Sequence, residues 1–469
     1  MKYCFSLLAF ALSLSVGASN LKVSTPLLYI EPGQAYTLFN VSWDNSWYNT
    51  NNHDAVWLFF KSISEEGGYA HIKVAQEGHK VVSVFSNDPK LEFEVPKDGT
   101  GLFLKPGNTF RGRVEVTLKI NLDRPSFRDV DQRGWYFNAY GIEMVNIPQG
   151  GFTLGDPDPA AQEFGSFYAP NKRGKPSGLV EITSQNQVLT VSETGDLFYN
   201  SGEYLYEGDQ QGPIPATYPK GVSPFYMMKY EPTEGQYVAF LNSLRPDQSA
   251  ARIIHTERRY ASQGGTITPK NGKYITPNPN KPCLFFGWDD AMAFADWAGL
   301  RPMTEFEYTK AARGTSPPKA HDFPWGTHSK EKIQRIPNPD RTLGMVNSWD
   351  ESHLTDETKA HFGASYYWVM DLAGSVWERV ITVGHSKGRA FTGVHGDGVL
   401  SANGTADVQD WPYGESDGGI GFRGGGFYGH NQEYQEFNPF SPVAYRRYGG
   451  WHGAMRNNAY SARFVRSID

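Results

Sequence analysis

Residues 421–429 read Gly-Phe-Arg-Gly-Gly-Gly-Phe-Tyr-Gly, and this stretch restricts the fold more than any other part of the chain. Five glycines in nine positions allow positive φ angles and a close approach of the backbone to a neighbour or a ligand. A phosphate-binding loop is not indicated, because neither a Lys-Ser/Thr ending nor a strand-loop-helix context follows the glycines. We therefore predict a loop of defined shape, anchored by hydrogen bonds from Arg423.

The composition is that of a loop-rich globular protein. The chain of 469 residues is long enough for two or three domains and a large core. Its 50 glycines, 30 prolines and 14% aromatic residues favour short strands and loops over long helices. The formal net charge is −6 and no basic block occurs, so a nucleic-acid partner is not expected.

The first 18 residues have the order of a secretory signal peptide: Lys2, an apolar run over residues 5–16, and small residues up to an expected cleavage near Ala18. Cys4 lies too early to carry the lipid of a bacterial lipoprotein, and no later segment is apolar enough to span a membrane. We expect an exported protein, in the periplasm, at the outer-membrane surface or secreted. Cys283 would then be its one cysteine, which excludes an internal disulfide.

Residues 21–123 predict an all-β accessory domain. Short runs rich in β-branched and aromatic residues are separated by turn residues, which is typical of antiparallel strands in a sandwich. The charged, Pro-containing stretch 124–139 is the predicted linker. The strand runs are residues 36–41, 56–60, 81–85, 91–95 and 114–120.

A second domain is predicted over residues 140–469, which makes the expected fold class α+β. Its residues 156–212 are polar and rich in Gly and Pro, which indicates an insertion of loops and short hairpins. Capping signals and apolar periodicity predict short helices. They run from Thr233 to Leu244, from Asp289 to Gly299 and from Thr304 to Gly314.

Several segments of this second domain resemble, in order, signatures of the formylglycine-generating enzyme (sulfatase-modifying factor) family. The last of these segments, Ser461-Ala462-Arg463-Phe464-Val465-Arg466, stands where the family usually ends on a Gly-Phe-Arg motif. The resemblance covers residues 140–469 and implies a C-type-lectin-like fold with sparse regular structure. The other segments are Lys-Tyr-Glu-Pro-Thr-Glu-Gly-Gln-Tyr at 229–237, Arg-Pro-Met-Thr-Glu-Phe-Glu-Tyr at 301–308 with Ala-Ala-Arg-Gly at 311–314, Met-Asp-Leu-Ala-Gly-Ser-Val-Trp-Glu at 370–378, and Arg-Gly-Gly-Gly-Phe at 423–427.

The resemblance also implies what this chain lacks. The oxidases of the family use two cysteines, shortly after the Arg-Gly-Gly loop, to bind copper and activate dioxygen. These positions fall on Gly429 and Tyr434 here. Thiolates suit Cu(I) because both are soft, whereas glycine has no side chain and a phenol is a hard ligand, so no copper is expected. Cys283 belongs to another motif, and we expect it to be a small buried hydrophobic residue.

Calcium is a separate expectation. The family binds it partly through the segment that corresponds to residues 374–378, and the ligands here would be Gly374, Val376 and Glu378. Asn347 matches the start of a second calcium site, whose acidic part differs over residues 350–360. The alternative is that Glu378 forms a salt bridge with an arginine such as Arg379 or Arg423.

The segment 445–452 interleaves arginines with aromatic residues, which can stack on a sugar or peptide and bind a carboxylate or sulfate. In the family this neighbourhood lines the substrate groove. The alternative is that its rings belong to the core and its arginines to the solvated surface. The predicted ligand-binding residues are Arg423, Tyr428, His430, Tyr434, Arg446, Arg447, Tyr448 and Trp451.

Together these features lead to the hypothesis of an exported, non-catalytic binding or scaffold protein whose ligand is a protein, peptide or glycan. Similar cysteine-free relatives occur in gliding-motility and type IX secretion machinery, which extends the hypothesis to such an apparatus. The rival hypothesis is an enzyme of the same superfamily with a non-copper site. Its catalytic residues would be His430, Glu433, Tyr434 and His452.

Overall fold

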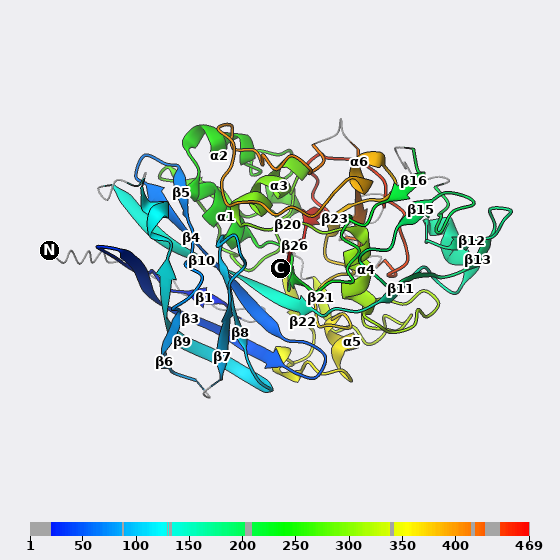
Figure 1. Cartoon of the computed structure of the whole chain (residues 1–469), viewed down its shortest axis with the longest axis horizontal. Coiled ribbons are helices and arrows are strands. Elements are labelled where there is room, and N and C mark those ends of the chain that lie inside the picture. The colour runs from blue at the N-terminus through cyan, green and yellow to red at the C-terminus, as the bar shows by residue number, and fades with distance from the viewer. Residues whose placement is uncertain are drawn as a thin grey trace.

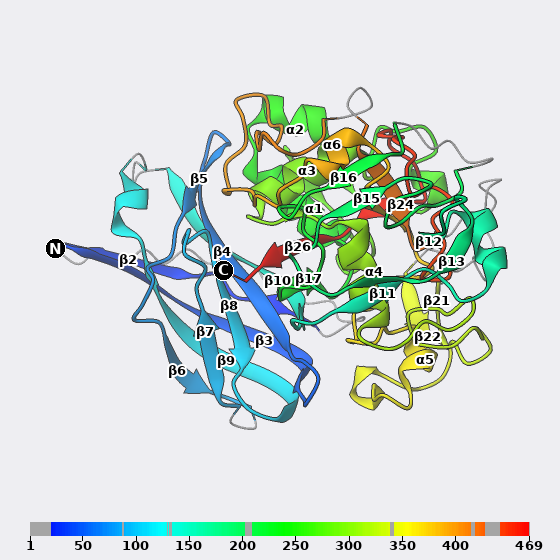
Figure 2. The same cartoon turned by 45° about the vertical axis from the view of Figure 1, so that its right-hand side comes forward.

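The computed structural model describes residues 20–86, 89–128, 130, 134–201, 209–337, 342–413, 418–426 and 441–468. Within these residues, strands outnumber helices and the helices are short, which confirms a mixed fold. The N-terminal strands form one end of the molecule, and the remaining elements form the other (Figure 1). The C-terminal end of the chain lies between these two parts, as the rotated view also shows (Figure 2).

Two large sheets organise the N-terminal part. The first has the strand order β1-β3-β9-β6, with β2 on β3, and the second has the order β20-β26-β17-β10-β4-β8-β7, with β5 on β4. The first sheet contains β1 (Lys22–Val23), β2 (Leu27–Glu31), β3 (Gln34–Tyr48), β6 (Lys80–Val84) and β9 (Phe110–Leu122). The second contains β4 (Asp54–Ser64), β5 (Tyr69–Ile72), β7 (Leu91–Glu94), β8 (Leu102–Pro106), β10 (Trp135–Ile147), β17 (Phe225–Met228), β20 (Arg301–Pro302) and β26 (Phe464–Ser467).

Strand β4 belongs to both halves of the core. Successive side chains of a strand point to opposite faces, so a strand covered on both faces reads as a continuous apolar run. Val56 and Leu58 pack in the core between the two large sheets. Trp57 and Phe59 pack on the other face, where the Phe59 ring meets that of Trp297 at a centroid distance of 5.0 Å. The apolar run over residues 56–60, which predicts a sandwich strand, therefore also packs against the second half of the protein.

The predicted linker differs from the observed chain. A 3₁₀ helix covers Arg124–Phe127, but β10 already begins at Trp135 and pairs with β4 along residues 135–145. Along residues 144–147, β10 also pairs with β17. The second sheet is therefore shared by the predicted accessory domain and the predicted second domain. Residues 135–139, which were predicted as the C-terminal part of the linker, are therefore part of a paired strand.

The second half contains small sheets and short helices. Its three-stranded sheet has the order β24-β23-β25, with β23 (Trp377–Ile381), β24 (Ile420–Arg423) and β25 (Tyr460–Ala462). The paired short strands are β11 (Phe152–Leu154) with β14 (Val180–Ile182), β12 (Ala169–Pro170) with β13 (Pro176–Gly178), β15 (Leu189–Val191) with β16 (Gly212–Ile214), β18 (Thr268–Lys270) with β19 (Lys273–Ile275), and β21 (Arg335–Pro337) with β22 (Leu343–Met345). The helices are α1 (Glu234–Ser243), α2 (Pro246–Arg252), α3 (Trp288–Trp297), α4 (Glu305–Arg313), α5 (Lys359–Phe362) and α6 (Ser386–Arg389), with further 3₁₀ turns at Pro159–Phe164, Ala261–Gln263 and Glu351–His353.

The three predicted helices are confirmed as α1, α3 and α4. Thr233 and Thr304 cap α1 and α4 in reciprocal capping boxes with Gln236 and Glu307. The short hairpin β12/β13 lies within residues 156–212, as expected for that stretch. Strands β15 and β16 also pair, but residues 192–211 separate them and β16 ends at Ile214.

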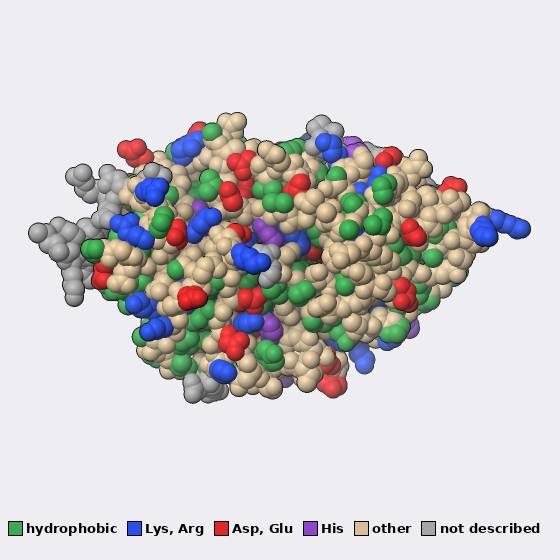
Figure 3. Space-filling model, viewed as in Figure 1, with side chains coloured by type: hydrophobic (Ala, Val, Ile, Leu, Met, Phe, Trp, Pro, Cys, Tyr) green, Lys and Arg blue, Asp and Glu red, His purple; other side chains and the backbone are tan. Residues whose placement is uncertain are grey.

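The described surface is mixed in charge. On the face in Figure 3, Lys and Arg side chains lie interspersed with Asp and Glu side chains. Among the described residues, none of the helices combines the length and apolar character that crossing a bilayer requires.

Candidate functional site

Glu305, in the first turn of α4, joins the glycine loop to the segment that follows it. Its side chain is fully buried and accepts from Arg446 Nε at 2.5 Å and from Arg446 Nη2 at 3.1 Å. Arg423 Nη1 lies 3.5 Å from the same carboxylate. We call Glu305, Arg423 and Arg446 the Glu305 cluster. A buried carboxylate with two guanidinium partners stabilises this region through charge-assisted hydrogen bonds.

The two arginines are also packed against rings. The Arg423 guanidinium lies 4.6 Å from the Tyr308 ring centroid, and that of Arg446 lies 3.8 Å from the Phe167 centroid. Arg423 also donates to the Val443 carbonyl, which confirms that it anchors the glycine loop. Arg423 and Arg446 are 2% and 1% exposed, so their predicted contact with a ligand needs correction. Burial places both guanidinium groups in the core instead of on an open surface.

The glycine loop fits tightly against its neighbours. Gly424 and Gly425 have φ angles of 93° and 84°, which other residues adopt only with strain. A Cβ atom on Gly424 would lie 2.7 Å from the Leu372 carbonyl oxygen. Residues 421–423 belong to strand β24, so the predicted loop of defined shape is confirmed over residues 424–426.

A partly exposed aromatic surface lies beside this loop. Arg447, Tyr448, Trp451 and His452 are each half-buried. The Tyr448 and Trp451 ring centroids are 5.7 Å apart, and Trp451 also packs on Phe422 at 5.7 Å. We call Arg447, Tyr448, Trp451 and His452 the 447–452 surface. The rings therefore contact the core, as the alternative has it, whereas the buried Arg446 does not fit a solvated surface. Ligand binding by the half-buried residues stays a prediction.

Other predicted residues of this region lie outside the described residues. They are Tyr428, His430, Glu433 and Tyr434, together with Gly429. Their contact with a ligand and the rival catalytic arrangement stay predictions.

Glu378 is engaged in an ion pair. Arg463 Nη2 donates to Glu378 Oε1 at 2.6 Å, and Arg463 Nε lies 3.0 Å from both carboxylate oxygens. Both side chains are fully buried. The partner is thus Arg463 and neither Arg379 nor Arg423, because β23 and β25 pair in parallel and bring the C-terminal segment alongside.

The ion pair occupies the carboxylate that was predicted to bind calcium. A calcium ion needs carboxylate and carbonyl oxygens with free lone pairs, and the Glu378 carboxylate already accepts three hydrogen bonds from a cation. As arranged, Glu378 does not fit a calcium site with Gly374 and Val376. Calcium binding there stays a prediction that would require this ion pair to open.

The residues of the second predicted calcium site also have hydrogen-bond partners within the protein. Asn347 is half-buried, and its Oδ1 accepts from the backbone of Trp349 at 3.0 Å. In the neighbouring acidic stretch, Glu351 accepts from Lys229 Nζ at 2.8 Å and from the Tyr230 hydroxyl. The ammonium group of Lys229 thus supplies the positive charge next to Glu351. Among the described residues, no group of three or more His, Cys, Asp or Glu side chains is placed to hold a metal ion.

Comparison with known proteins identifies the family. A family profile described as "Sulfatase-modifying factor enzyme 1-like domain" matches residues 181–447, which is more than half of the chain. The chain belongs to this family. Its relatives include the formylglycine-generating enzyme of Mus musculus, at 26% identity over 264 residues, 53% of this chain and 61% of the mouse protein.

Two shorter matches accompany this one. The formylglycine-generating enzyme of Thermomonospora curvata is 33% identical over 108 residues, 23% of this chain and 35% of the relative. The inactive C-alpha-formylglycine-generating enzyme 2 of Bos taurus is 34% identical over 104 residues, 21% of this chain and 31% of the relative. Each match thus spans less than two thirds of the relative's own length.

Cys283 is a core residue in this member of the sulfatase-modifying factor family. Its side chain is fully buried among apolar residues, as expected. Burial raises the pKa of the Cys283 thiol well above its usual range, with Glu234 and Asp290 adding to the effect. A thiol that stays protonated and inaccessible is a poor ligand for a soft metal.

The structure also contains a cavity that the sequence analysis did not find. It lies between the N-terminal strands β1 and β10 and the start of α1, and Glu231 of the first family motif is part of its wall. The sequence signal was limited to an acidic residue beside Pro232, which does not reveal burial.

Proposed function

We propose that this chain is an exported, non-catalytic binding or scaffold protein that uses a C-type-lectin-like domain of the sulfatase-modifying factor family to hold a protein, peptide or glycan. The observation that carries the proposal is the replacement of the copper-binding cysteine pair by Gly429 and Tyr434, with Cys283 buried elsewhere. The names of the relatives include both formylglycine-generating enzymes and an inactive form, so loss of the activity has a precedent among similar proteins.

The 447–452 surface supports a binding role. Half-buried aromatic rings beside an arginine supply stacking area at low cost in side-chain entropy, and such residues concentrate binding energy at interfaces. The buried Glu305 cluster holds the base of this segment, because Arg446 directly precedes Arg447. A rigid support of this kind favours recognition by a preformed surface.

The cellular setting is part of the proposal. The N-terminal 18 residues favour export, and the partner class that fits the family resemblance is a component of a surface secretion or gliding-motility apparatus. Detection of the protein in the periplasmic, outer-membrane or secreted fraction of its native cells is the expected result.

A binding experiment tests the proposed function. The purified protein is applied to glycan and peptide arrays, and hits are measured by calorimetry with Arg447→Ala and Trp451→Ala variants. We expect each variant to weaken binding by about tenfold or more, because truncating a central aromatic or arginine residue costs about 1–2 kcal/mol or more.

The controls are Arg173→Ala, which makes the same change at an exposed arginine, and Tyr136→Ala, which removes an aromatic ring at another exposed position. Both are expected to bind as the unchanged protein does. Blank arrays would contradict the binding role. Full affinity of the Arg447→Ala and Trp451→Ala variants would place the site elsewhere on the molecule.

A further inference from the structure

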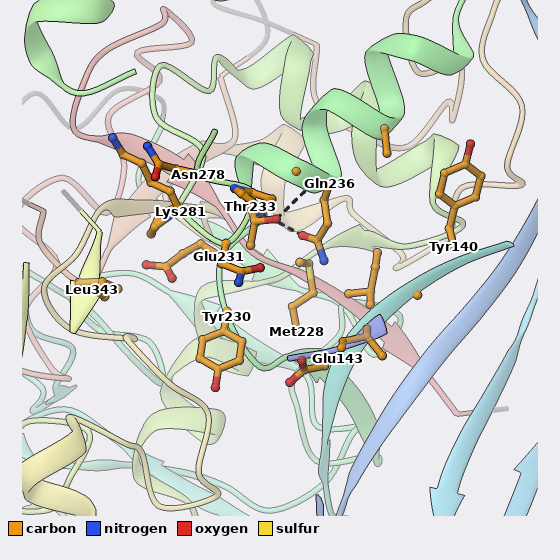
Figure 4. A pocket seen from close by; sticks show the side chains of 18 of the residues that line it. Tyr140, Glu143, Met228, Tyr230, Glu231, Thr233, Gln236, Asn278, Lys281 and Leu343 are labelled. Carbon is orange, nitrogen blue, oxygen red and sulfur yellow. Dashed lines mark hydrogen bonds between the residues drawn. The ribbon is translucent and has the colours of Figure 1, made fainter. Parts of the chain in front are cut away.

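The cavity between the N-terminal strands and the family domain has the size of a small-molecule site. Its volume is about 730 Å³, within the range that encloses small organic ligands. Figure 4 shows Glu231 near its centre, with Lys281 and Leu343 on one side and Met228 and Glu143 on the other. The cavity is separate from the 447–452 surface, none of whose residues lines it.

Much of the wall is apolar and aromatic. Phe59, Tyr140 and Trp297 form an aromatic corner, in which the ring centroids of Tyr140 and Trp297 are 4.9 Å apart and the ring planes meet at 69°. Leu21, just before β1, and Val23 of β1 add aliphatic surface. Such a wall favours a ligand with an apolar or aromatic body, and its ring faces also attract cations.

Glu231 is a buried carboxyl group in this wall that has an ion pair but lacks hydrogen bonds. Its side chain is 1% exposed, and neither carboxylate oxygen has a hydrogen-bond partner among the described residues. Its carboxylate forms a salt bridge with Arg463 Nη2 at 3.7 Å, which is longer than a hydrogen bond. That guanidinium donates instead to Glu378 and to the carbonyls of Met228 and Met370. A buried carboxyl group without hydrogen bonds is costly, so it calls for a partner.

The charges around Glu231 favour a cationic partner. Burial raises the pKa of Glu231, Arg463 lowers it, and the neighbouring Asp371 and Glu378 carboxylates raise it, with a net value of about 8. A cation bound next to this carboxyl group would lower its pKa and so favour the anionic form. The cations of the wall have other acceptors: Arg335 donates to both oxygens of Asp371 at 2.9 Å, and Lys281 Nζ donates to the Gly264 carbonyl.

We propose that this cavity binds a small organic cation, a protonated amine or guanidinium carried on an apolar or aromatic body, with Glu231 as its anionic partner. A metal ion fits less well, because among the described residues no group of three or more His, Cys, Asp or Glu side chains is placed to hold one. The ligand bridges the two halves of the molecule, since β1 and β10 supply one wall while α1 and residues 277–282 supply another.

Calorimetry with 2-phenylethylamine and its uncharged analogue 2-phenylethanol tests the proposal. We expect the amine to bind about tenfold or more tightly than the alcohol, because a charge-assisted hydrogen bond in a buried site is worth at least this factor. A short peptide with one lysine, acetyl-Phe-Lys-amide, forms a second arm. Tighter binding of the peptide than of the amine would identify the source of the cation as a peptide side chain.

Two variants separate a ligand site from a structural role. Glu231→Gln removes the charge and is expected to lower affinity for the amine about tenfold or more, while binding of the alcohol stays the same. Ala239→Phe keeps Glu231 and fills the cavity from α1, so it should abolish binding of both compounds. Glu181→Gln makes the same chemical change at an exposed carboxylate and is the control.

Thermal unfolding of each variant verifies the fold. If Glu231→Gln fails to fold, the Ala239→Phe variant still tests whether the amine binds in the cavity. The proposal is overturned if none of the cationic probes binds at millimolar concentration. It is also overturned if amine and alcohol bind equally, or if binding survives both cavity variants.

Discussion

Glu305→Ala is expected to lower the free energy of unfolding by about 3–5 kcal/mol, because it leaves two buried guanidinium groups without their carboxylate. Arg446 would lose both of its hydrogen bonds to Glu305, and Arg423 would lose its nearest anion. The hydroxyl of Thr382 and the amide of Val383 would each lose an acceptor. Urea unfolding followed by tryptophan fluorescence measures the change.

The control for this prediction is Asp247→Ala. Its salt bridge with Arg245 lies at the surface, where the two side chains are 67% and 44% exposed. Exposed pairs contribute about 0–1 kcal/mol, so this variant should unfold almost as the unchanged protein does. An equally small effect of Glu305→Ala would show that the Glu305 cluster does not hold the glycine loop and the 447–452 surface.

Trp57→Ala is the second large effect that we expect, with a loss of about 3–5 kcal/mol. The indole is fully buried, packs on Phe103 at a centroid distance of 4.7 Å and donates to the Ala298 carbonyl at 2.8 Å. This bond joins β4 of the N-terminal part to the end of α3, so its loss should destabilise both parts. Scanning calorimetry should show every unfolding transition at a lower temperature.

Val82→Ala is the matched control, since Val82 on β6 is 55% exposed and its truncation should change stability by about 0.5 kcal/mol or less. If Trp57→Ala shifted one transition and left another unchanged, the shared sheet would not couple the two parts as the strand pairing indicates.

Local features were predictable where a few neighbouring residues decide the structure. The capping boxes at Thr233 and Thr304 involve residues three apart, and both helices begin at the predicted place. The apolar run 56–60 indicated a strand. Its burial on both faces depends on α3 and β10, which are distant in sequence, and so the sharing of the sheet was missed.

For the site residues too, contacts between residues far apart in the sequence were not predicted. The anchoring role of Arg423 was predicted, but the burial of Arg446 was not, because its partner Glu305 lies 141 residues away. The salt-bridge alternative for Glu378 was correct in kind and wrong in partner, since Arg463 approaches through parallel pairing of β23 with β25. The cavity around Glu231 arises from segments of both halves of the chain, and no local pattern encodes it.

Copper binding and dioxygen consumption test the central claim most directly, namely that this chain keeps the family's scaffold without its copper chemistry. The purified protein is titrated anaerobically with Cu(I) against a competing chelator, and oxygen uptake is then followed with a cysteine-containing peptide. We predict no stoichiometric copper and no oxygen uptake above the protein-free rate, because Gly429 and Tyr434 replace the thiolates and Cys283 is buried. One tightly held copper per chain with peptide-dependent oxygen uptake would contradict the claim.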